Sequence, residues 1–171
     1  MEIVNHLLAN ASFVESPNCS ERKIPADLII LHCISLPEGE YGNNNVIDLF
    51  LNTLNLKSHK TFESLENVCV SSHVFIKRTG KIIQFVPFNK VAWHAGKSSY
   101  KGRENCNEFS IGIELEGSIK DYFEDIQYVR LNEIIHCLRE EYRHMDVVGH
   151  RDVAPLRKLD PGEKFDWERL N

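Results

Sequence analysis

Leu28-Ile29-Ile30-Leu31-His32 (LIILH) is the stretch of this sequence that constrains the fold most. Four successive apolar residues, two of them β-branched, end on a histidine. A run this short favours a strand buried on both faces over a buried helix, which needs about ten residues or more. Functional side chains often stand at strand ends in such folds, so His32 is the first candidate for chemistry.

A second strand is predicted over residues 109–115, where the sequence reads FSIGIEL. Alternation divides its side chains between two faces: Ile111, Ile113 and Leu115 on one, and Gly112, Glu114 and Glu116 on the other. If both faces are covered, Glu114 is a buried carboxylate that needs a partner or a task. If the second face is solvated, Glu114 and Glu116 are ordinary surface acids. Gly112 is expected to mark a close approach of two backbones.

Helical and strand patterns are interspersed along the rest of the chain. Helical spacing is shown by Ile47, Phe50, Leu51 and Leu54, and over about five turns by Tyr128, Leu131, Ile135, Leu138 and Tyr142. The other expected elements are a hairpin over 73–88 that turns at Gly80, a strand over 145–149, and loops over 35–45, over 96–107 and from Arg151 onward. This order predicts an α/β (α+β) fold, with a central mixed β-sheet flanked by helices, in a single domain spanning residues 1–171.

Composition narrows the class of protein. The 171 residues are 42% hydrophobic and 26% charged, and the net charge of −5 argues against a binder of nucleic acid or anionic membranes. No apolar run approaches the roughly 20 residues of a membrane span. The N-terminal residues lack the positive start and continuous apolar segment of a secretory signal. Five widely spaced cysteines, with no C-x-x-C pair, suit a reducing compartment. We therefore expect a cytoplasmic protein, monomeric by default, with no nucleic-acid or membrane partner.

Three histidines, His32, His94 and His150, are expected just past strand ends. Neutral imidazole is a good zinc ligand, and catalytic zinc typically takes three protein ligands and leaves a fourth position for water. The sequence has no H-E-x-x-H motif, so a zinc site would have to be assembled from separated segments. For each histidine taken singly, a partly exposed polar residue is the alternative.

The segment 149–162, GHRDVAPLRKLDPG, concentrates polar side chains in a loop that contains two prolines. His150, Lys158 and Asp160 lie within eleven residues of one another. Lys158 could supply positive charge to a developing oxyanion. The alternative is a polar surface loop.

Six segments carry a resemblance to a known family: ILHCISLPEGEYG, RTGKIIQFVPF, AWHAG, GRENCN, FSIGIELEG and GHRDVAPLRKLDPG. Together, and in this order, they resemble the AmpD-type anhydro-N-acetylmuramoyl-L-alanine amidases of the amidase_2 and peptidoglycan-recognition-protein superfamily. The resemblance runs from about Leu28 to the C-terminus. The first 25 residues are the least covered.

The resemblance implies a hydrolase with one zinc ion per chain. It implies cleavage of the amide between the lactyl group of muramic acid and L-alanine, on anhydro-muropeptides recovered in cytosolic cell-wall recycling. The matching positions are His32, His150 and Asp160 for zinc, Glu114 and Lys158 for catalysis, and Trp93 and His94 for the substrate groove. Arg103 is the candidate contact for a carboxylate of the stem peptide.

Some positions depart from the family pattern. Cys33 follows the first zinc histidine where Asn is common, and Cys69 and Asn105 stand where basic residues are common. Two other functions remain as alternatives. One is a muropeptide-binding receptor of the same fold that does not cleave, although this chain retains the full set of candidate ligands and catalytic residues. The other is an amidase acting on intact peptidoglycan, which would require export.

Overall fold

The strand β5 (Leu28–Ile34) lies inside a six-stranded sheet of order β12-β5-β11-β6-β7-β3, within residues 1–170, which the computed structural model describes. It continues two residues beyond the predicted run, so His32 lies within the strand. β5 pairs in parallel with β12 on one side and with β11 on the other, over seven residues. β6 pairs in parallel with β11 but antiparallel with β7. The mixed sheet predicted from the sequence is confirmed.

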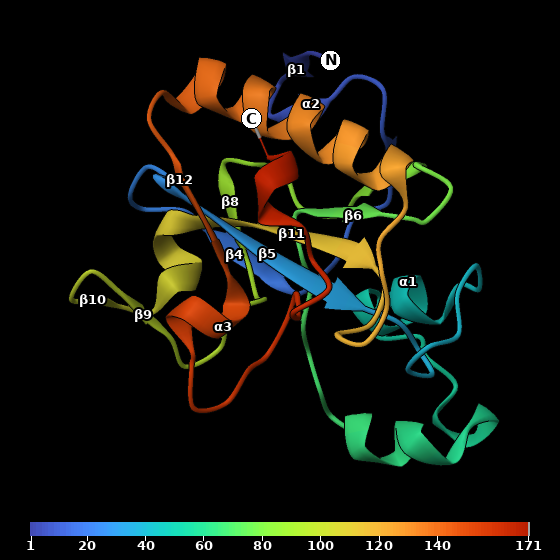
Figure 1. The fold of residues 1–171 in the computed structure, drawn as a ribbon. Helices are drawn as coiled ribbons and strands as arrows, with labels where there is room; N and C mark the ends of the chain where they lie inside the picture. Colours follow the sequence, from blue (N-terminus) through green and yellow to red (C-terminus); the bar gives the residue numbers. More distant parts are fainter. Residues whose placement is uncertain (171) are drawn as a thin grey trace.

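The remaining elements surround this sheet (Figure 1). The strands are β1 (Ile3–Val4), β2 (Leu7–Leu8), β3 (Ser12–Phe13), β4 (Cys19–Glu21), β6 (Val74–Ile76), β7 (Ile82–Gln84), β8 (Lys90–Ala92), β9 (Ser99–Tyr100), β10 (Arg103–Glu104), β11 (Ser110–Glu116) and β12 (Asp146–Gly149). The α-helices are α1 (Asn45–Phe50), α2 (Asp125–Tyr142) and α3 (His150–Val153). The short 3-10 helices are η1 (Leu56–Ser58), η2 (Lys60–Leu65), η3 (Cys106–Phe109) and η4 (Trp167–Arg169).

The long helix α2 covers one face of the sheet (Figure 1). Its apolar side chains repeat at helical spacing, and they pack on the odd-numbered residues of β5 and β11. This core contains Ile29, Leu31, Ile111, Ile113, Leu115, Tyr128, Leu131, Ile134, Ile135 and Leu138. The five-turn helix predicted from the sequence is therefore confirmed, and so is the face assigned to the three apolar residues of β11.

The opposite face of the sheet is covered by α1, α3 and η3 with their loops. Leu28 and Ile30 of β5 pack there against Phe109 and Val153. Because both faces are covered, every residue of β11 is buried, including Glu114 and Glu116. The solvated alternative for these two carboxylates is thereby wrong. Glu116 accepts hydrogen bonds from the backbone N–H groups of Gly42 and Arg78, at 2.7 and 2.9 Å, and so ties the loop 35–45 to the hairpin turn.

Four local predictions differ from the structure. The helix α1 ends at Phe50, so the predicted helix that reached Leu54 is too long. Phe50 is buried, and Ile47 and Leu54 pack partly buried on the same core, as the spacing predicted; Val46 and Leu49 are buried there in addition. The expected loop over 96–107 contains the hairpin of β9 and β10, which turns through left-handed backbone at Lys101 and Gly102. The tail from Arg151 begins inside α3 rather than as loop.

The fourth difference concerns Gly112. A Cβ atom there would lie 2.5 Å from Cγ of His94, so the close approach is made by an imidazole ring rather than by a second backbone. The hairpin turn at Gly80, with φ of +79°, is as predicted. Over residues 1–170, no helix is both long enough and apolar enough to cross a membrane.

Candidate active site

His32 of β5 and Glu114 of β11 are direct register partners in the parallel pair. Both side chains point to the face opposite α2, because their neighbours in sequence fill the core beneath that helix. His32 Nδ1 lies 4.0 Å from Glu114 Oε1. Strand pairing, which residue spacing cannot reveal, therefore places the two candidates side by side.

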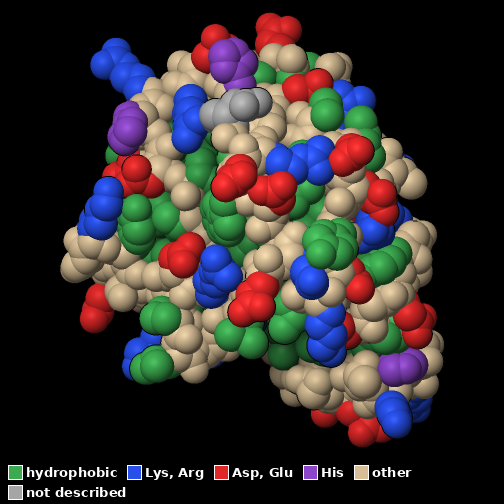
Figure 2. Space-filling view, viewed as in Figure 1, with side chains coloured by type: hydrophobic (Ala, Val, Ile, Leu, Met, Phe, Trp, Pro, Cys, Tyr) green, Lys and Arg blue, Asp and Glu red, His purple; other side chains and the backbone are tan. Residues whose placement is uncertain are grey.

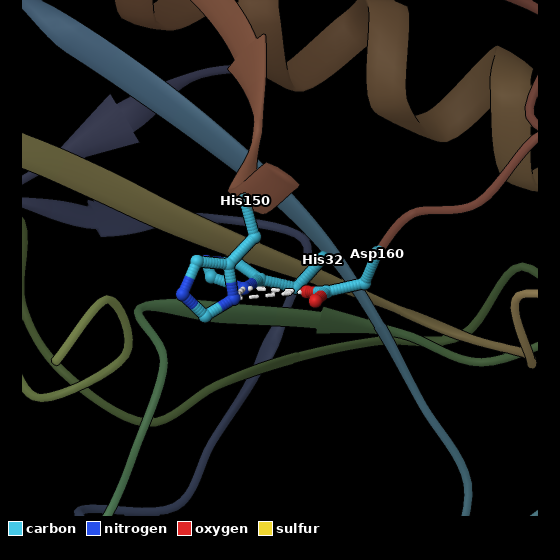
Figure 3. A group of neighbouring side chains, drawn as sticks. All are labelled: His32, His150 and Asp160. Atoms are coloured by element: carbon cyan, nitrogen blue, oxygen red, sulfur yellow. Dashed lines mark hydrogen bonds and ion pairs between the residues drawn. The ribbon is translucent and has the colours of Figure 1, made fainter. Parts of the chain in front are cut away.

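His150 and Asp160 join this pair from the C-terminal part of the chain (Figure 3). β12 lies beside β5, and His150 is the first residue after β12. His32 Nδ1 lies 2.9 Å from His150 Nδ1 and 3.1 Å from Asp160 Oδ2, and His150 Nδ1 lies 3.0 Å from the same oxygen. Two imidazole nitrogens and one carboxylate oxygen thus converge on one point.

The protonation states suit a cation at this point. Burial is the main reason that the pKa of His32 falls to about 4, which keeps the ring neutral at neutral pH. Burial raises the pKa of Asp160, but its contacts with His150 and His32 outweigh burial and hold that pKa far below its ordinary value. His150 Nε2 lies 3.1 Å from the carbonyl oxygen of Ala95 and donates its proton there, which leaves Nδ1 as the nitrogen that can serve as a ligand. Two neutral histidines and one carboxylate are a donor set that zinc accepts, and the site fits that metal.

Glu114 is a buried carboxyl group in this region. Its Oε2 atom is buried and has no hydrogen-bond partner within the described chain. Burial, and then the neighbouring charge of Asp160, raise the pKa of Glu114 well above its ordinary value, while Lys158 lowers it. A carboxyl group with a raised pKa and a free oxygen is suited to receive and return a proton.

These residues line one cavity of about 510 Å³. Polar lining comes from His32, His94, Glu114, His150, Lys158 and Asp160. Apolar lining comes from Leu49, Phe50, Leu65, Val68 and Val70. The segment that contains η1 and η2 projects from the body of the protein (Figure 1), and Figure 2 shows the surface hollowed beside this lobe at its lower edge. The cavity thus combines charged groups with an apolar wall.

Two of the predicted substrate residues lie elsewhere. Trp93 is 37% exposed and Arg103 is an exposed residue of β10, and neither is among the described residues that line the cavity. The Arg103 guanidinium forms an ion pair with Asp27 at 2.6 Å and stacks 3.6 Å above the ring of Phe109. The Arg103 guanidinium is thus engaged outside the cavity, and its contact with a carboxylate of the stem peptide stays a prediction.

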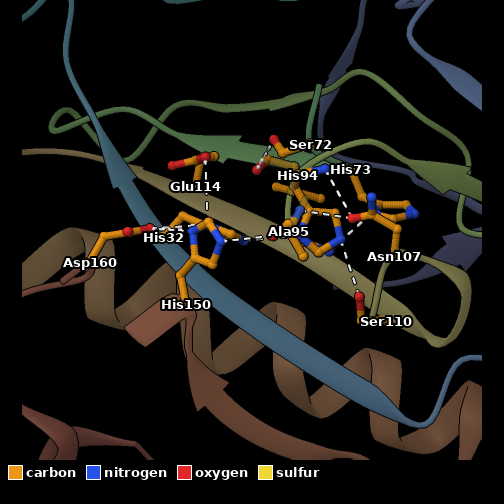
Figure 4. Close-up of polar contacts among 12 residues, drawn as sticks. His32, Ser72, His73, His94, Ala95, Asn107, Ser110, Glu114, His150 and Asp160 are labelled. Carbon is orange, nitrogen blue, oxygen red and sulfur yellow. Dashed lines mark hydrogen bonds and ion pairs between the residues drawn. The ribbon is translucent and has the colours of Figure 1, made fainter. Parts of the chain in front are cut away.

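His94 lines the cavity, but its ring also faces the candidate ligands. His94 Nδ1 lies 2.9 Å from His32 Nε2, and His94 Nε2 lies 3.2 Å from Ser110 Oγ (Figure 4). Burial, and then the neighbouring charge of His32, hold the pKa of His94 well below 6.5, so this ring is neutral too. The sequence analysis did not predict a contact between His32 and His94, because it gave them separate roles and they lie far apart in the sequence.

Two asparagines that the sequence analysis missed shape the site. Asn107 Oδ1 accepts hydrogen bonds from the backbone N–H groups of His94 and Ala95, at 3.2 and 2.8 Å. Asn18, 2% exposed, donates to Asn52 Oδ1 and to the carbonyl of Val70, both at 2.8 Å, and so closes the base of the projecting lobe. Asn107 is the last residue of GRENCN, one of the six segments that carry the family resemblance, and that resemblance could have identified it. No spacing pattern singled out Asn18.

Comparison with known proteins agrees with this geometry. The Amidase_2 family, N-acetylmuramoyl-L-alanine amidase, matches residues 22–163. The chain is 43% identical over 173 residues to the 1,6-anhydro-N-acetylmuramyl-L-alanine amidase AmpD of Haemophilus influenzae, covering 98% of this chain and 94% of that protein.

Solved structures of relatives share the fold. The crystal structure of a selenomethionine derivative of AmpD has a TM-score of 0.98 at 43% identity, and the match covers 99% of this chain and 97% of that one. The amidase AmiD from Escherichia coli, solved in complex with the substrate anhydro-N-acetylmuramic acid-L-Ala-D-γ-Glu-L-Lys, has a TM-score of 0.61 at 30% identity. That match covers 85% of this chain and 56% of AmiD. The chain therefore belongs to the Amidase_2 family of N-acetylmuramoyl-L-alanine amidases, and within it to the AmpD type.

Proposed function

We propose that this amidase is a zinc enzyme of cytoplasmic peptidoglycan recycling. It hydrolyses the amide between the lactyl group of 1,6-anhydro-N-acetylmuramic acid and the L-alanine of the stem peptide. A single domain, residues 1–171, acts as a monomer with one zinc ion. The observation that carries the proposal is the convergence of His32 Nδ1, His150 Nδ1 and Asp160 Oδ2, within 3.1 Å of one another, beside the unpartnered Glu114 Oε2.

His32, His150 and Asp160 would hold the zinc ion. When bound, zinc supplies Lewis acidity, which polarises a carbonyl group and makes water a nucleophile at neutral pH. The ligand atoms belong to β5, to the first residue of α3 and to the loop that follows α3, so the fold itself sets their spacing. The remaining steps depend on two other residues of the cavity.

Glu114 moves the proton. Its carboxylate orients the attacking water and accepts one of its protons as the oxygen bonds to the lactyl carbonyl carbon. The same carboxyl group then donates this proton to the L-alanine nitrogen as the carbon–nitrogen bond breaks. The free Oε2 atom provides the acceptor, and burial makes the protonated form accessible.

Lys158 lines the same cavity and carries the positive charge. An ammonium group there stabilises the oxyanion that develops when water adds to the carbonyl carbon, as a preorganised electrostatic group does. Lys158 also lowers the pKa of Glu114, so the two groups interact within the cavity.

The substrate class is supported by relatives and by shape. The Haemophilus relative is named for the 1,6-anhydro substrate, and AmiD binds an anhydro-muramoyl tripeptide. A cavity of about 510 Å³ with one apolar wall and one charged wall accommodates a sugar next to a short peptide.

The test is product analysis of purified anhydro-N-acetylmuramoyl-tripeptide by mass spectrometry, with and without a chelator, together with metal analysis of the protein. We expect one zinc ion per chain, and free tripeptide only in the reaction without chelator. A parallel reaction with the reducing-end N-acetylmuramoyl-tripeptide measures the preference for the anhydro form.

Other outcomes point to the alternatives. Intact substrate after incubation with folded, zinc-loaded protein would support a muropeptide receptor. Cleavage confined to insoluble peptidoglycan would support an amidase of the intact wall. A His150→Ala variant that still held one zinc ion per chain would overturn the ligand set.

A further inference from the structure

We propose that His94 is a positioning residue of the metal site: through Ser110 and a hydrogen bond from His32, it fixes the tautomer in which His32 presents Nδ1 to zinc. This inference rests on the proposed function, because it concerns the residues that would hold the metal. It assigns His94 a role different from the substrate contact expected from the sequence. The contacts that support it are drawn in Figure 4.

The proton positions follow from the far end of this chain of contacts. Ser110 Oγ lies 2.6 Å from the carbonyl oxygen of Cys106, so the only hydroxyl proton of Ser110 is donated there. Ser110 Oγ must then be the acceptor toward His94 Nε2, 3.2 Å away. His94 therefore carries its proton on Nε2, and a neutral ring leaves a lone pair on Nδ1.

The same reasoning extends to the ligand. His94 Nδ1 lies 2.9 Å from His32 Nε2, and one proton must lie between these two nitrogens. Since His94 Nδ1 has none, His32 Nε2 donates, and His32 Nδ1 holds the lone pair that faces His150 and Asp160. Outer residues of this kind commonly fix the tautomer and ring orientation of a metal-binding histidine.

A second arm orients the other histidine. Asn107 Oδ1 accepts from the backbone N–H groups of His94 and Ala95, which fixes the peptide that carries both residues. The carbonyl of Ala95 then accepts the Nε2 proton of His150. The short segment after β8 thus supplies both acceptors. His94 Nδ1 accepts from His32, and the carbonyl oxygen of Ala95 accepts from His150.

The ring of His94 has little freedom to leave this position. It lies directly on Gly112, whose missing side chain makes the space for it. The ring of His73 lies beside it, with centroids 5.9 Å apart, but the hydrogen bonds of the His73 ring go to other residues. His73 has separate partners: its Nδ1 accepts from the Gly112 N–H at 3.0 Å, and its Nε2 lies 3.1 Å from the carbonyl of Lys90. His73 is therefore a matched control, buried and adjacent but outside the chain that reaches the ligands.

The first experiment measures zinc affinity by competition with a chelator of known affinity. His94→Leu removes the acceptor, and we expect the zinc dissociation constant to rise about 10- to 100-fold. His94→Asn places an amide oxygen near the former Nδ1 position and should recover most of the affinity. His73→Asn should bind zinc as the wild type does. Equal affinity in wild type and His94→Leu, with the apo proteins folded, would refute the proposal.

The second experiment needs no variant, so a folding defect cannot obscure it. The wild-type protein, labelled with ¹⁵N and loaded with ¹¹³Cd, is examined by long-range ¹H–¹⁵N correlation of the imidazole rings. We expect cadmium coupling to Nδ1 of His32, a proton on Nε2 of His32, and a proton on Nε2 but not Nδ1 of His94. Coupling of cadmium to Nε2 of His32, or a proton on Nδ1 of His94, would overturn the assignment.

The two proposals fail in different ways. If the wild-type chain binds no stoichiometric zinc or cadmium, the proposed metal enzyme is wrong. If it binds metal and cleaves substrate, but the tautomers or the His94→Leu affinity contradict the expectation, only the positioning role of His94 is wrong.

Discussion

At the scale of single residues, the site depends on where protons and lone pairs lie. Glu114 combines a buried oxygen without a partner in the described chain with a pKa raised chiefly by burial. Asp160 lies nearby, yet its contacts with two histidines hold its pKa far below the ordinary value. The pKa values of two carboxyl groups in one cavity are thereby shifted in opposite directions, which separates a proton carrier from a metal ligand.

The variant Glu114→Gln tests the proton-transfer role. The amide side chain keeps the shape of the carboxylate but cannot accept a proton from water, so we expect kcat to fall at least about 100-fold, the lower end of what general acid–base catalysis contributes. Zinc content should stay at one per chain, because Glu114 is not among the three converging ligands. Product formation and metal analysis on the same preparation check both points. Loss of zinc in this variant would show that the carboxylate is needed to build the site.

Replacement of Lys158 tests the charge. Lys158→Met keeps much of the aliphatic length and removes the ammonium group, so we expect kcat to fall about 100- to 1,000-fold while KM changes little. Steady-state kinetics on the muropeptide separate the two parameters. A rise in KM at unchanged kcat would instead make Lys158 a binding residue. Lys97, exposed and outside this cavity's described lining, is the control cation.

At the scale of elements, β11 organises the site because consecutive positions on one of its faces have different tasks. Ser110 contacts His94, Gly112 makes room for its ring, Glu114 pairs in register with His32, and Glu116 anchors two loops. The other face of the same strand packs under α2. A single residue of register shift would therefore exchange the polar and apolar faces and eliminate both core and site.

Gly112→Ala tests this arrangement. The new Cβ would come within 2.5 to 2.7 Å of three ring atoms of His94, so the ring must move. We expect a loss of about 1–3 kcal/mol in the free energy of unfolding, as for other overpacked positions, together with weaker zinc binding. Urea unfolding of the apo protein and chelator competition measure the two effects. Gly102→Ala, where no atom lies within 4 Å of the new Cβ, should cost some stability through its φ of +78° and leave zinc affinity unchanged.

Helices and strands were predicted correctly where neighbouring residues alone determine the pattern. β5, β11 and α2 were predicted because short apolar runs, alternation and helical spacing are properties of neighbouring residues. α1 was predicted too long, and the burial of Val46 and Leu49 was missed, because that burial is decided by the sheet they meet rather than by their own spacing. The hairpin of β9 and β10 was missed because polar, glycine-containing sequence also describes a loop.

The candidate site was also predictable only in part. Its residue types were predictable, largely through the family resemblance, but the adjacency of His32 and Glu114 comes from strand register, and that of His150 from the position of β12 beside β5. The contact of His94 with His32 depends on how a loop folds over Gly112. Such long-range pairings are set by the whole sheet, so no local pattern contains them.

At the scale of the whole molecule, the covered sheet encloses several ionisable groups. His73 is fully buried, and its pKa falls to about 3, chiefly through burial and then through the charge of Arg22. Arg22 itself donates to the carbonyls of Lys90, Glu108 and Ser110, at 2.8 to 3.1 Å, and so joins β8, η3 and β11. These contacts stabilise a neutral histidine beside a half-buried cation.

Acid stability of the apo protein should therefore depend on His73. The ordinary pKa of histidine is 6.5 and that of His73 in the fold is about 3, so between these values the unfolded chain binds the extra proton and stability falls as pH falls. The slope is at most about 1.4 kcal/mol per pH unit for one histidine. Urea unfolding in chelator at pH 7, 6 and 5 should give a shallower pH dependence for His73→Asn than for wild type. Glu114, whose pKa is raised, acts in the opposite sense in both proteins and cancels in the difference. Parallel curves would contradict the expectation.

The order of the three converging ligands along the chain has a consequence for biosynthesis. His32 is made long before His150 and Asp160, and β5 acquires one of its two neighbours only when β12 is complete. Since chains are synthesised from the N-terminus, a growing or truncated polypeptide that ends between residues 115 and 149 contains the proton carrier Glu114 but lacks two of the three converging ligands. We therefore expect metal binding, and with it hydrolysis, only in polypeptides that extend past residue 160.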